Sequence, residues 1–135
     1  MSYKIDEIEG IGPAYREKLS AVKIESTDDL LEQCADPAGR KAVAEKTGVS
    51  EKVLLDWTNK ADLMRISGVG PQFSELLEAA GVDTVKELRN RNAENLSTKM
   101  EEVNAVKNLA NASPPASTIT KWVEAAKKLD PIIKY

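Results

Sequence analysis

The chain has 135 residues and a formal net charge of −3, with 30% charged residues, which suits one compact domain or two very small ones. Its single cysteine and its lack of histidine exclude an intramolecular disulfide, the common zinc sites and the histidine-dependent catalytic triads. The single cysteine favours a reducing, cytoplasmic setting. The sequence has no apolar run near the roughly 18 residues of a membrane span. The net charge argues against strong, indiscriminate nucleic-acid binding.

The first expected helix begins at Pro13, directly after the turn Gly10-Ile11-Gly12. Proline suits a first helical position, because the N–H that it lacks would have no helical partner there. Ser26, followed by Asp29 three residues later, resembles a capping box and predicts the start of a second helix.

Two more helices are expected before residue 66. Asp36-Pro37 is typical of a cap and first turn, and Gly48 is a suitable end for that helix. Ser50 then caps a helix of about residues 51–65, which runs into the next glycine turn.

The second part of the chain repeats these signals. Residues 68–71 form another Gly-apolar-Gly-Pro turn, and Thr84, with a glutamate three residues later, gives a stricter capping box. Gly81 ends a helix, Ser117 starts one and Pro131 stops it. No run of β-branched residues alternates long enough for a strand, so the sequence predicts an all-α protein.

An offset of 58 residues aligns "EGIGPAY", residues 9–15, with "SGVGPQF", residues 67–73. Trp57 and Trp122 then correspond at an offset of 65, so the second copy has about seven extra residues, which we expect around "NASPPAS". We interpret the chain as two units related by duplication, residues 1–62 and 63–135, which share the helix at about 51–65.

A Gly-x-Gly turn between helices has a physical use. Glycine permits positive φ and lets a foreign main chain approach, because no Cβ intervenes. The apolar residues between the glycines, Ile11 and Val69, are expected to point inward. The N–H groups of the turn and of the next helix would point outward, an arrangement that favours an anion such as phosphate.

At these residues the sequence resembles the helix-hairpin-helix family. It is also similar to the N-terminal domain of archaeal RecA-like recombinases, to the C-terminal domain of the bacterial RNA polymerase alpha subunit, and to a tandem bacterial group known as a domain of unknown function. The resemblance implies weak binding of the nucleic-acid backbone without sequence preference. It implies that two sets of residues contact DNA. The main-chain donors would be Gly10, Ile11, Gly12, Gly68, Val69 and Gly70, and the cations would be Arg16, Lys18, Lys46, Lys52 and Arg65.

Local charge makes the second turn the better candidate for DNA. Residues 1–62 carry 9 Lys and Arg against 13 Asp and Glu, whereas residues 63–135 carry 10 against 9. Asp6, Glu7 and Glu9 precede the first turn and would repel a phosphate, while Arg65 precedes the second and could reach one.

Two alternatives stay open beside DNA binding. The module could bind another protein, or its turns could serve packing alone. The sequence shows no convergent acid–base site and no nucleotide-binding loop, so we expect neither catalysis nor a cofactor nor a metal site, and we expect a monomer. Trp57, Trp122, Tyr15 and Phe73 are expected in the core, and Cys34 as a small buried residue.

Overall fold

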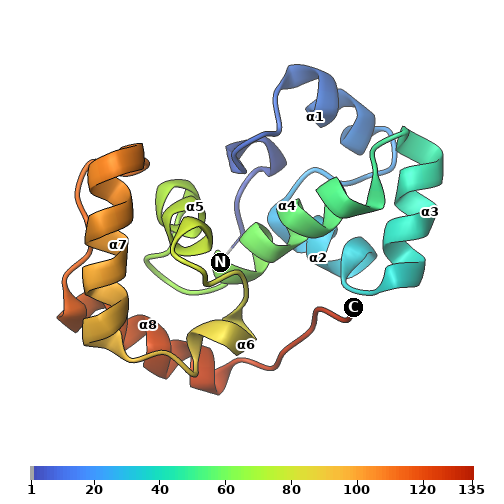
Figure 1. The fold of residues 1–135 in the computed structure, drawn as a ribbon. Helices are drawn as coiled ribbons and strands as arrows, with labels where there is room; N and C mark the ends of the chain where they lie inside the picture. Colours follow the sequence, from blue (N-terminus) through green and yellow to red (C-terminus); the bar gives the residue numbers. More distant parts are fainter. Residues whose placement is uncertain (1) are drawn as a thin grey trace.

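The computed structural model describes residues 2–135, which form helices joined by short connections and, within that range, no β-strand (Figure 1). The predicted all-α class is confirmed. None of the described helices is long and apolar enough to cross a membrane. In chain order the elements are the 3₁₀ helix η1 (Ile5–Glu7), then α1 (Pro13–Ser20), α2 (Thr27–Cys34), α3 (Pro37–Thr47), α4 (Glu51–Leu63), α5 (Pro71–Ala79), α6 (Val85–Leu88), α7 (Ala93–Lys107) and α8 (Ala116–Lys128).

The helix starts in the first part of the chain lie where the capping signals place them. Ser26 accepts the N–H of Asp29, and the Asp29 carboxylate accepts the N–H of Ser26, so this capping box is complete. Asp36 and Ser50 cap α3 and α4 with their side-chain oxygens. Gly48 ends α3 with a φ of 78°, a left-handed conformation that glycine adopts without strain.

The capping box predicted at Thr84 forms only in part. The Thr84 hydroxyl accepts the N–H of Glu87, as expected. The Glu87 carboxylate instead accepts a hydrogen bond from Arg91, 3.0 Å away and one helical turn later. The Arg91 guanidinium thus binds the carboxylate that would otherwise have accepted the N–H of Thr84 and completed the box.

The second half of the chain has a longer third helix and a longer connection before its last helix than the first half has. Helix α7 is 15 residues long and α3 is 11, although both follow the same kind of side-chain cap, from Asn92 and Asp36. The connection over residues 108–115 is also longer than the one over residues 48–50. The loop around "NASPPAS" is therefore longer than the connection before α4, and so is the helix that precedes it.

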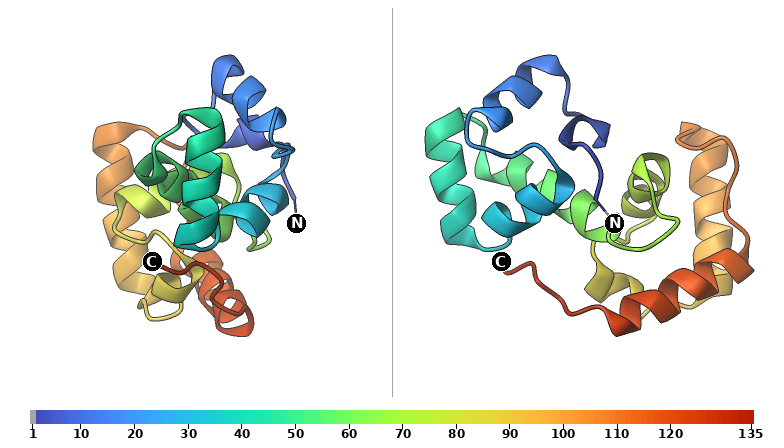
Figure 2. Two further views of the ribbon diagram at one scale, coloured as in Figure 1. Left: turned by 90° about the vertical axis from the view of Figure 1, so that its right-hand side faces the viewer. Right: turned by 180° about the vertical axis from the view of Figure 1, so that it is seen from behind.

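Two hydrophobic cores meet at α4: α1–α3 surround most of that helix, and α5–α8 lie beyond its C-terminal end (Figures 1 and 2). We call them the N-terminal and C-terminal cores. Helix α4 contributes Trp57 and Ala61 to the N-terminal core and Leu63 to the C-terminal core. The second half of α4, residues 57–63, is accordingly buried all round, including its polar residues Thr58, Asn59, Lys60 and Asp62.

Candidate functional site

The two glycine turns have the same backbone conformation. Gly10 has a φ of 97° and Gly68 a φ of 93°, which residues with a side chain rarely adopt. A Cβ at Gly10 would lie 3.3 Å from the indole Nε1 of Trp57, and one at Gly68 would lie 3.2 Å from that of Trp122. Each turn therefore needs glycine both for its conformation and for its contact with a tryptophan.

The residues between the glycines face the interior. Ile11 and Val69 are buried, as predicted. Their N–H groups donate within the turn, to the carbonyl of Ile8 at 3.1 Å and to that of Ile66 at 3.0 Å. These two N–H groups are therefore already bonded and do not add to the set of open donors.

The open donors lie at the starts of α1 and α5. Gly12 and Gly70 are the N-cap residues, and neither offers a side chain to the N–H groups of the first turn. Both have negative φ, and a Cβ at either position would have room. The two glycines thus keep a stretch of main chain accessible that a larger side chain would cover.

Arg65 does not extend freely toward the second turn. Its Nη1 donates to the Asp62 carboxylate at 2.8 Å and to the main-chain carbonyl of Asp130 at 3.0 Å. The side chain of Asp62 is only 3% exposed, and it also accepts the N–H of Val85 at 2.8 Å. Arg65 therefore neutralises a buried carboxylate, which reduces the positive charge that it could offer to a phosphate.

The cations near the first turn are more accessible. The side chain of Arg16 is 60% exposed and lies 3.7 Å from a carboxylate oxygen of Asp6. Lys18 is exposed, with its Nζ 5.8 Å from the centre of the Tyr15 ring. Glu9 is also exposed beside the turn, so carboxylates accompany these cations.

Lys46 and Lys52 lie on either side of the α3–α4 connection, in the last turn of α3 and the first turn of α4. Both side chains are exposed. They therefore belong to a different corner of the first half from the turn that precedes α1.

The tryptophans are confirmed as core residues, at 4% and 3% exposure. Each packs against the aromatic residue of its own hairpin. Tyr15 lies 5.1 Å from Trp57 between ring centres, and Phe73 lies 5.3 Å from Trp122. The prediction that Tyr15 is a core residue is wrong, because α1 buries only Leu19 and leaves Tyr15 40% exposed.

A shallow hollow lies beside the second turn. Its lining is largely aromatic side chains, proline and glycine main chain, and we call it the aromatic hollow: Tyr3, Gly68, Gly70, Pro71, Gln72 and Phe73. No cation is among these residues. Sequence reasoning missed Tyr3, because nothing local links an N-terminal residue to a turn so far along the chain.

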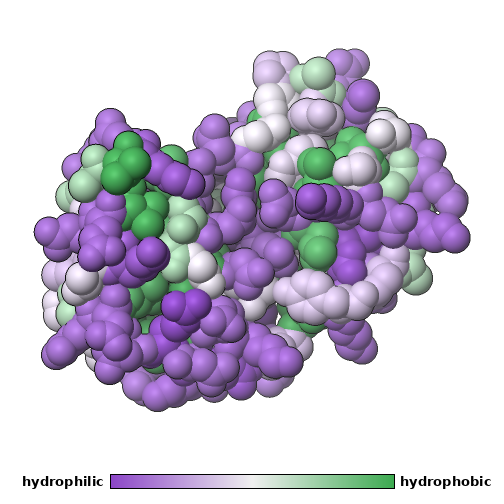
Figure 3. Space-filling view, viewed as in Figure 1, coloured by the Kyte–Doolittle hydropathy of each residue, from purple (hydrophilic) through white to green (hydrophobic). Residues whose placement is uncertain are grey.

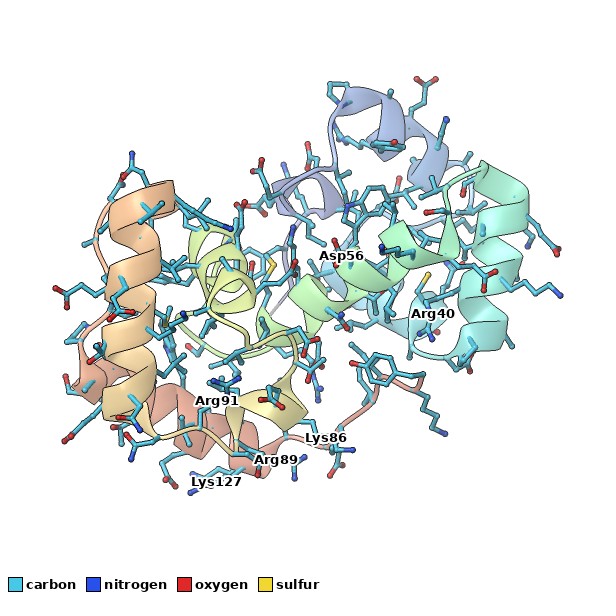
Figure 4. The ribbon with its side chains drawn as sticks, in the orientation of Figure 1. Arg40, Asp56, Lys86, Arg89, Arg91 and Lys127 are labelled. Carbon is cyan, nitrogen blue, oxygen red and sulfur yellow. The ribbon has the colours of Figure 1, made fainter. Side chains whose placement is uncertain are left out.

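The junction between the two halves carries charge. Hydrophilic residues cover this junction on the face shown in Figure 3. Figure 4 shows Asp56 on the middle part of α4. The Nζ of Lys60 donates to the Glu9 carbonyl at 3.4 Å. Burial raises the pKa of Glu75 and of Glu78 above the ordinary value, and neighbouring carboxylates raise each further, Glu9 for Glu75 and Asp56 for Glu78.

Basic side chains gather around α6 and the end of α8, where Figure 4 shows Lys86, Arg89, Arg91 and Lys127. Arg91 pairs with Glu87, and Lys127 lies 3.3 Å from Glu124. This group therefore has less free charge than its number of cations implies.

Cys34 is buried, as predicted, and burial raises the pKa of its thiol to about 11. Such a thiol is a poor nucleophile near neutral pH. Among residues 2–135, no group of three or more cysteine and acidic side chains is arranged to hold a metal ion.

Comparison with known proteins gives one finding about relationship. No curated protein and no solved structure matches the chain at the required significance. A family model described as "Domain of unknown function (DUF4332)" matches residues 9–129, which include both glycine turns and all eight α-helices. The chain therefore belongs to the DUF4332 family.

Proposed function

We propose that this chain is a non-catalytic binding module made of two helix-hairpin-helix units in tandem, residues 1–62 and 63–135, joined by α4. The recurrence of one hairpin geometry supports this interpretation. At a spacing of 58 residues, each unit has a glycine with positive φ, an uncapped helix after it, and a 2.9 Å main-chain bond that closes that helix: Ile24 N–H to Leu19 O, and Val82 N–H to Leu77 O. Each of these glycines lies against a tryptophan.

The ligand that best fits the second turn is another protein. The observation that carries this proposal is the lining of the aromatic hollow, which offers two aromatic side chains and exposed main chain but no cation. Aromatic side chains favour protein interfaces, and a partner's main chain can approach Gly70 closely because no Cβ intervenes. A phosphate there would lack the counter-charge on which nucleic-acid affinity depends, since Arg65 is bonded to Asp62.

A photo-crosslinking amino acid at Gln72 tests this proposal in a nuclease-treated cell extract. Gln72 is exposed and lines the hollow, and Ala14 is the matched control at the equivalent place in the first hairpin. We expect a protein adduct from position 72 and none from position 14. Gly70→Leu should abolish the adduct without unfolding the chain, because its φ of −99° suits any residue. Equal adducts from both positions, or none, would reject the proposal.

Nucleic-acid backbone binding is the second candidate, and the exposure of α1 favours it at the first turn. The N-terminus of this helix is open, and Arg16 and Lys18 are exposed on it. We expect micromolar or weaker affinity, because the nearby carboxylates oppose binding. That affinity should fall steeply with salt, because binding releases counterions from the phosphates.

Fluorescence anisotropy of a labelled duplex at about 50 and 200 mM salt tests this second candidate. Arg16→Gln should weaken binding by several fold, whereas Lys99→Gln, which removes the same charge from the exposed face of α7, should leave it nearly unchanged. The absence of any signal at the lower salt concentration would exclude nucleic acid.

A further inference from the structure

Helices α4 and α5 pack against each other where the two halves meet, and Figure 3 shows the surface hollowed there among hydrophilic residues. We call the charged groups of this place the acidic junction. Five carboxylates act on one another in it, those of Glu9, Asp56, Glu75, Glu78 and Asp83. Two ammonium groups oppose them, those of Lys60 and Lys107. The excess of negative charge equals the formal net charge of the whole chain, −3.

The lysines of the acidic junction do not pair with its carboxylates. Lys60 is 9% exposed, and its Nζ donates to the main-chain carbonyl of Glu9 at 3.4 Å. Lys107 is exposed at the end of α7. All the ion pairs within residues 2–135 lie elsewhere in the molecule. The carboxylates therefore keep most of their capacity to bind a cation from outside the chain.

Two buried oxygen atoms, Asn59 Oδ1 and Glu78 Oε2, accept no hydrogen bond from residues 2–135. Asn59 is 6% exposed. It shares one face of α4 with Asp56, Lys60 and Leu63, because residues three and four apart are neighbours on a helix. Leu63 packs in the C-terminal core, and Asp56 and Lys60 act on Glu78, so this face is directed toward α5. A buried acceptor without a donor costs stability, and both oxygens lack one.

We propose that the acidic junction binds a guanidinium group, carried by an arginine side chain of a protein partner. A guanidinium supplies the missing positive charge. It also carries more N–H donors than an ammonium, in a fixed plane, so one group can serve both buried oxygens and an outer carboxylate such as Asp56. A metal ion fits less well, because no three cysteine or acidic side chains among residues 2–135 are arranged to hold one.

This site is separate from the aromatic hollow, and it stands whether or not a partner occupies that hollow. The two places share only α5, which contributes Phe73 to the hollow and Glu75 and Glu78 to the acidic junction. A phosphate is excluded from the junction by the same excess of carboxylates that attracts a guanidinium. The partner class is therefore a protein with an exposed arginine.

An NMR titration of the full-length chain with acetyl-arginine amide tests the site. The matched probe is acetyl-citrulline amide, which has the same shape and a neutral urea in place of the guanidinium. We expect the arginine compound to shift the amide signals of residues 56–60 and 75–78 with a dissociation constant in the millimolar range, since a few charge-assisted hydrogen bonds supply that affinity. The citrulline compound should leave these signals in place.

Two variants of similar side-chain size locate the bound group. Asn59→Leu removes one buried acceptor, and Glu78→Gln removes the charge of the other. Each should weaken binding several fold, and the amide spectrum itself shows that the variant is folded. Glu45→Gln removes the same charge as Glu78→Gln from the exposed face of α3, and it should leave binding unchanged.

Three results would overturn the site: an equal response to the citrulline compound, binding that Asn59→Leu and Glu78→Gln both retain, or the same shifts from potassium chloride at equal ionic strength. Free arginine, whose carboxylate the junction repels, should bind more weakly than acetyl-arginine amide. Tighter binding of free arginine would overturn the protein partner, because the ligand would then be the amino acid.

Discussion

The two glycine turns have nearly the same backbone but very different surroundings. Helix α1 packs beside η1 and buries only Leu19, whereas α5 lies between α4 and α7 and buries Ser74, Leu76 and Leu77. The first turn therefore faces solvent among mixed charges, and the second faces an aromatic hollow. A repeated motif fixes local geometry, but the helices around it decide which ligand each copy can accept.

The largest predicted difference between the halves comes from Asp62 and the residue at the equivalent place, Lys4. Lys4 lies near the start of α2, and Asp62 lies near the start of α6. In the first half, the Thr27 N–H donates to the Tyr3 carbonyl, whereas in the second half the Val85 N–H donates to the Asp62 carboxylate.

Asp62→Ala should therefore destabilise the chain by about 3 kcal/mol, because it leaves the partly buried Arg65 without its buried partner. Lys4→Ala should change stability by less than about 0.5 kcal/mol, because the side chain is exposed. Urea unfolding followed by circular dichroism measures both. Similar losses of stability in the two variants would contradict the prediction that Asp62, and not Lys4, makes a stabilising side-chain contact.

The next largest effect tests the likeness of the two turns. Gly10→Ala and Gly68→Ala should each cost about 1–2 kcal/mol, because both glycines have positive φ. Gly12→Ala and Gly70→Ala are the matched controls, with negative φ and room for a Cβ, and should each cost about 0.5 kcal/mol, because alanine is a poorer N-cap than glycine. If only one of the positive-φ substitutions is destabilising, the turns are not energetically equivalent.

The smallest effect concerns Glu78, whose counterpart in the first half is Ser20. Burial, with Asp56 nearby, raises the pKa of Glu78 in the folded chain, so folding favours its protonated form. That favourable contribution is complete below the ordinary glutamate pKa, and it is lost as the pH rises through the raised value.

Glu78→Gln should accordingly raise the melting temperature slightly at pH 7 and have little effect near pH 4. Ser20→Gln, on the exposed counterpart, should leave the melting temperature unchanged at both pH values. Thermal unfolding at the two pH values measures the change. If Glu78→Gln lowers the melting temperature at pH 7, the ionised Glu78 carboxylate stabilises the folded chain and the prediction is wrong.

The sequence by itself determined the all-α class, the helix starts of the first half and the two glycine turns. These features depend on conformational preferences and contacts within a few residues, such as the capping box at Ser26 or the left-handed Gly48. A local pattern contains all the information that such features need.

Only the tertiary structure decided which groups the site can offer. It bonded Arg65 to a buried carboxylate and to the Asp130 carbonyl, left Tyr15 exposed, and placed Tyr3 beside the second turn. Each outcome depends on segments far apart in the chain. The direction of a cationic side chain depends on the partner that packing brings to it. A local sequence pattern does not show which residue that partner is.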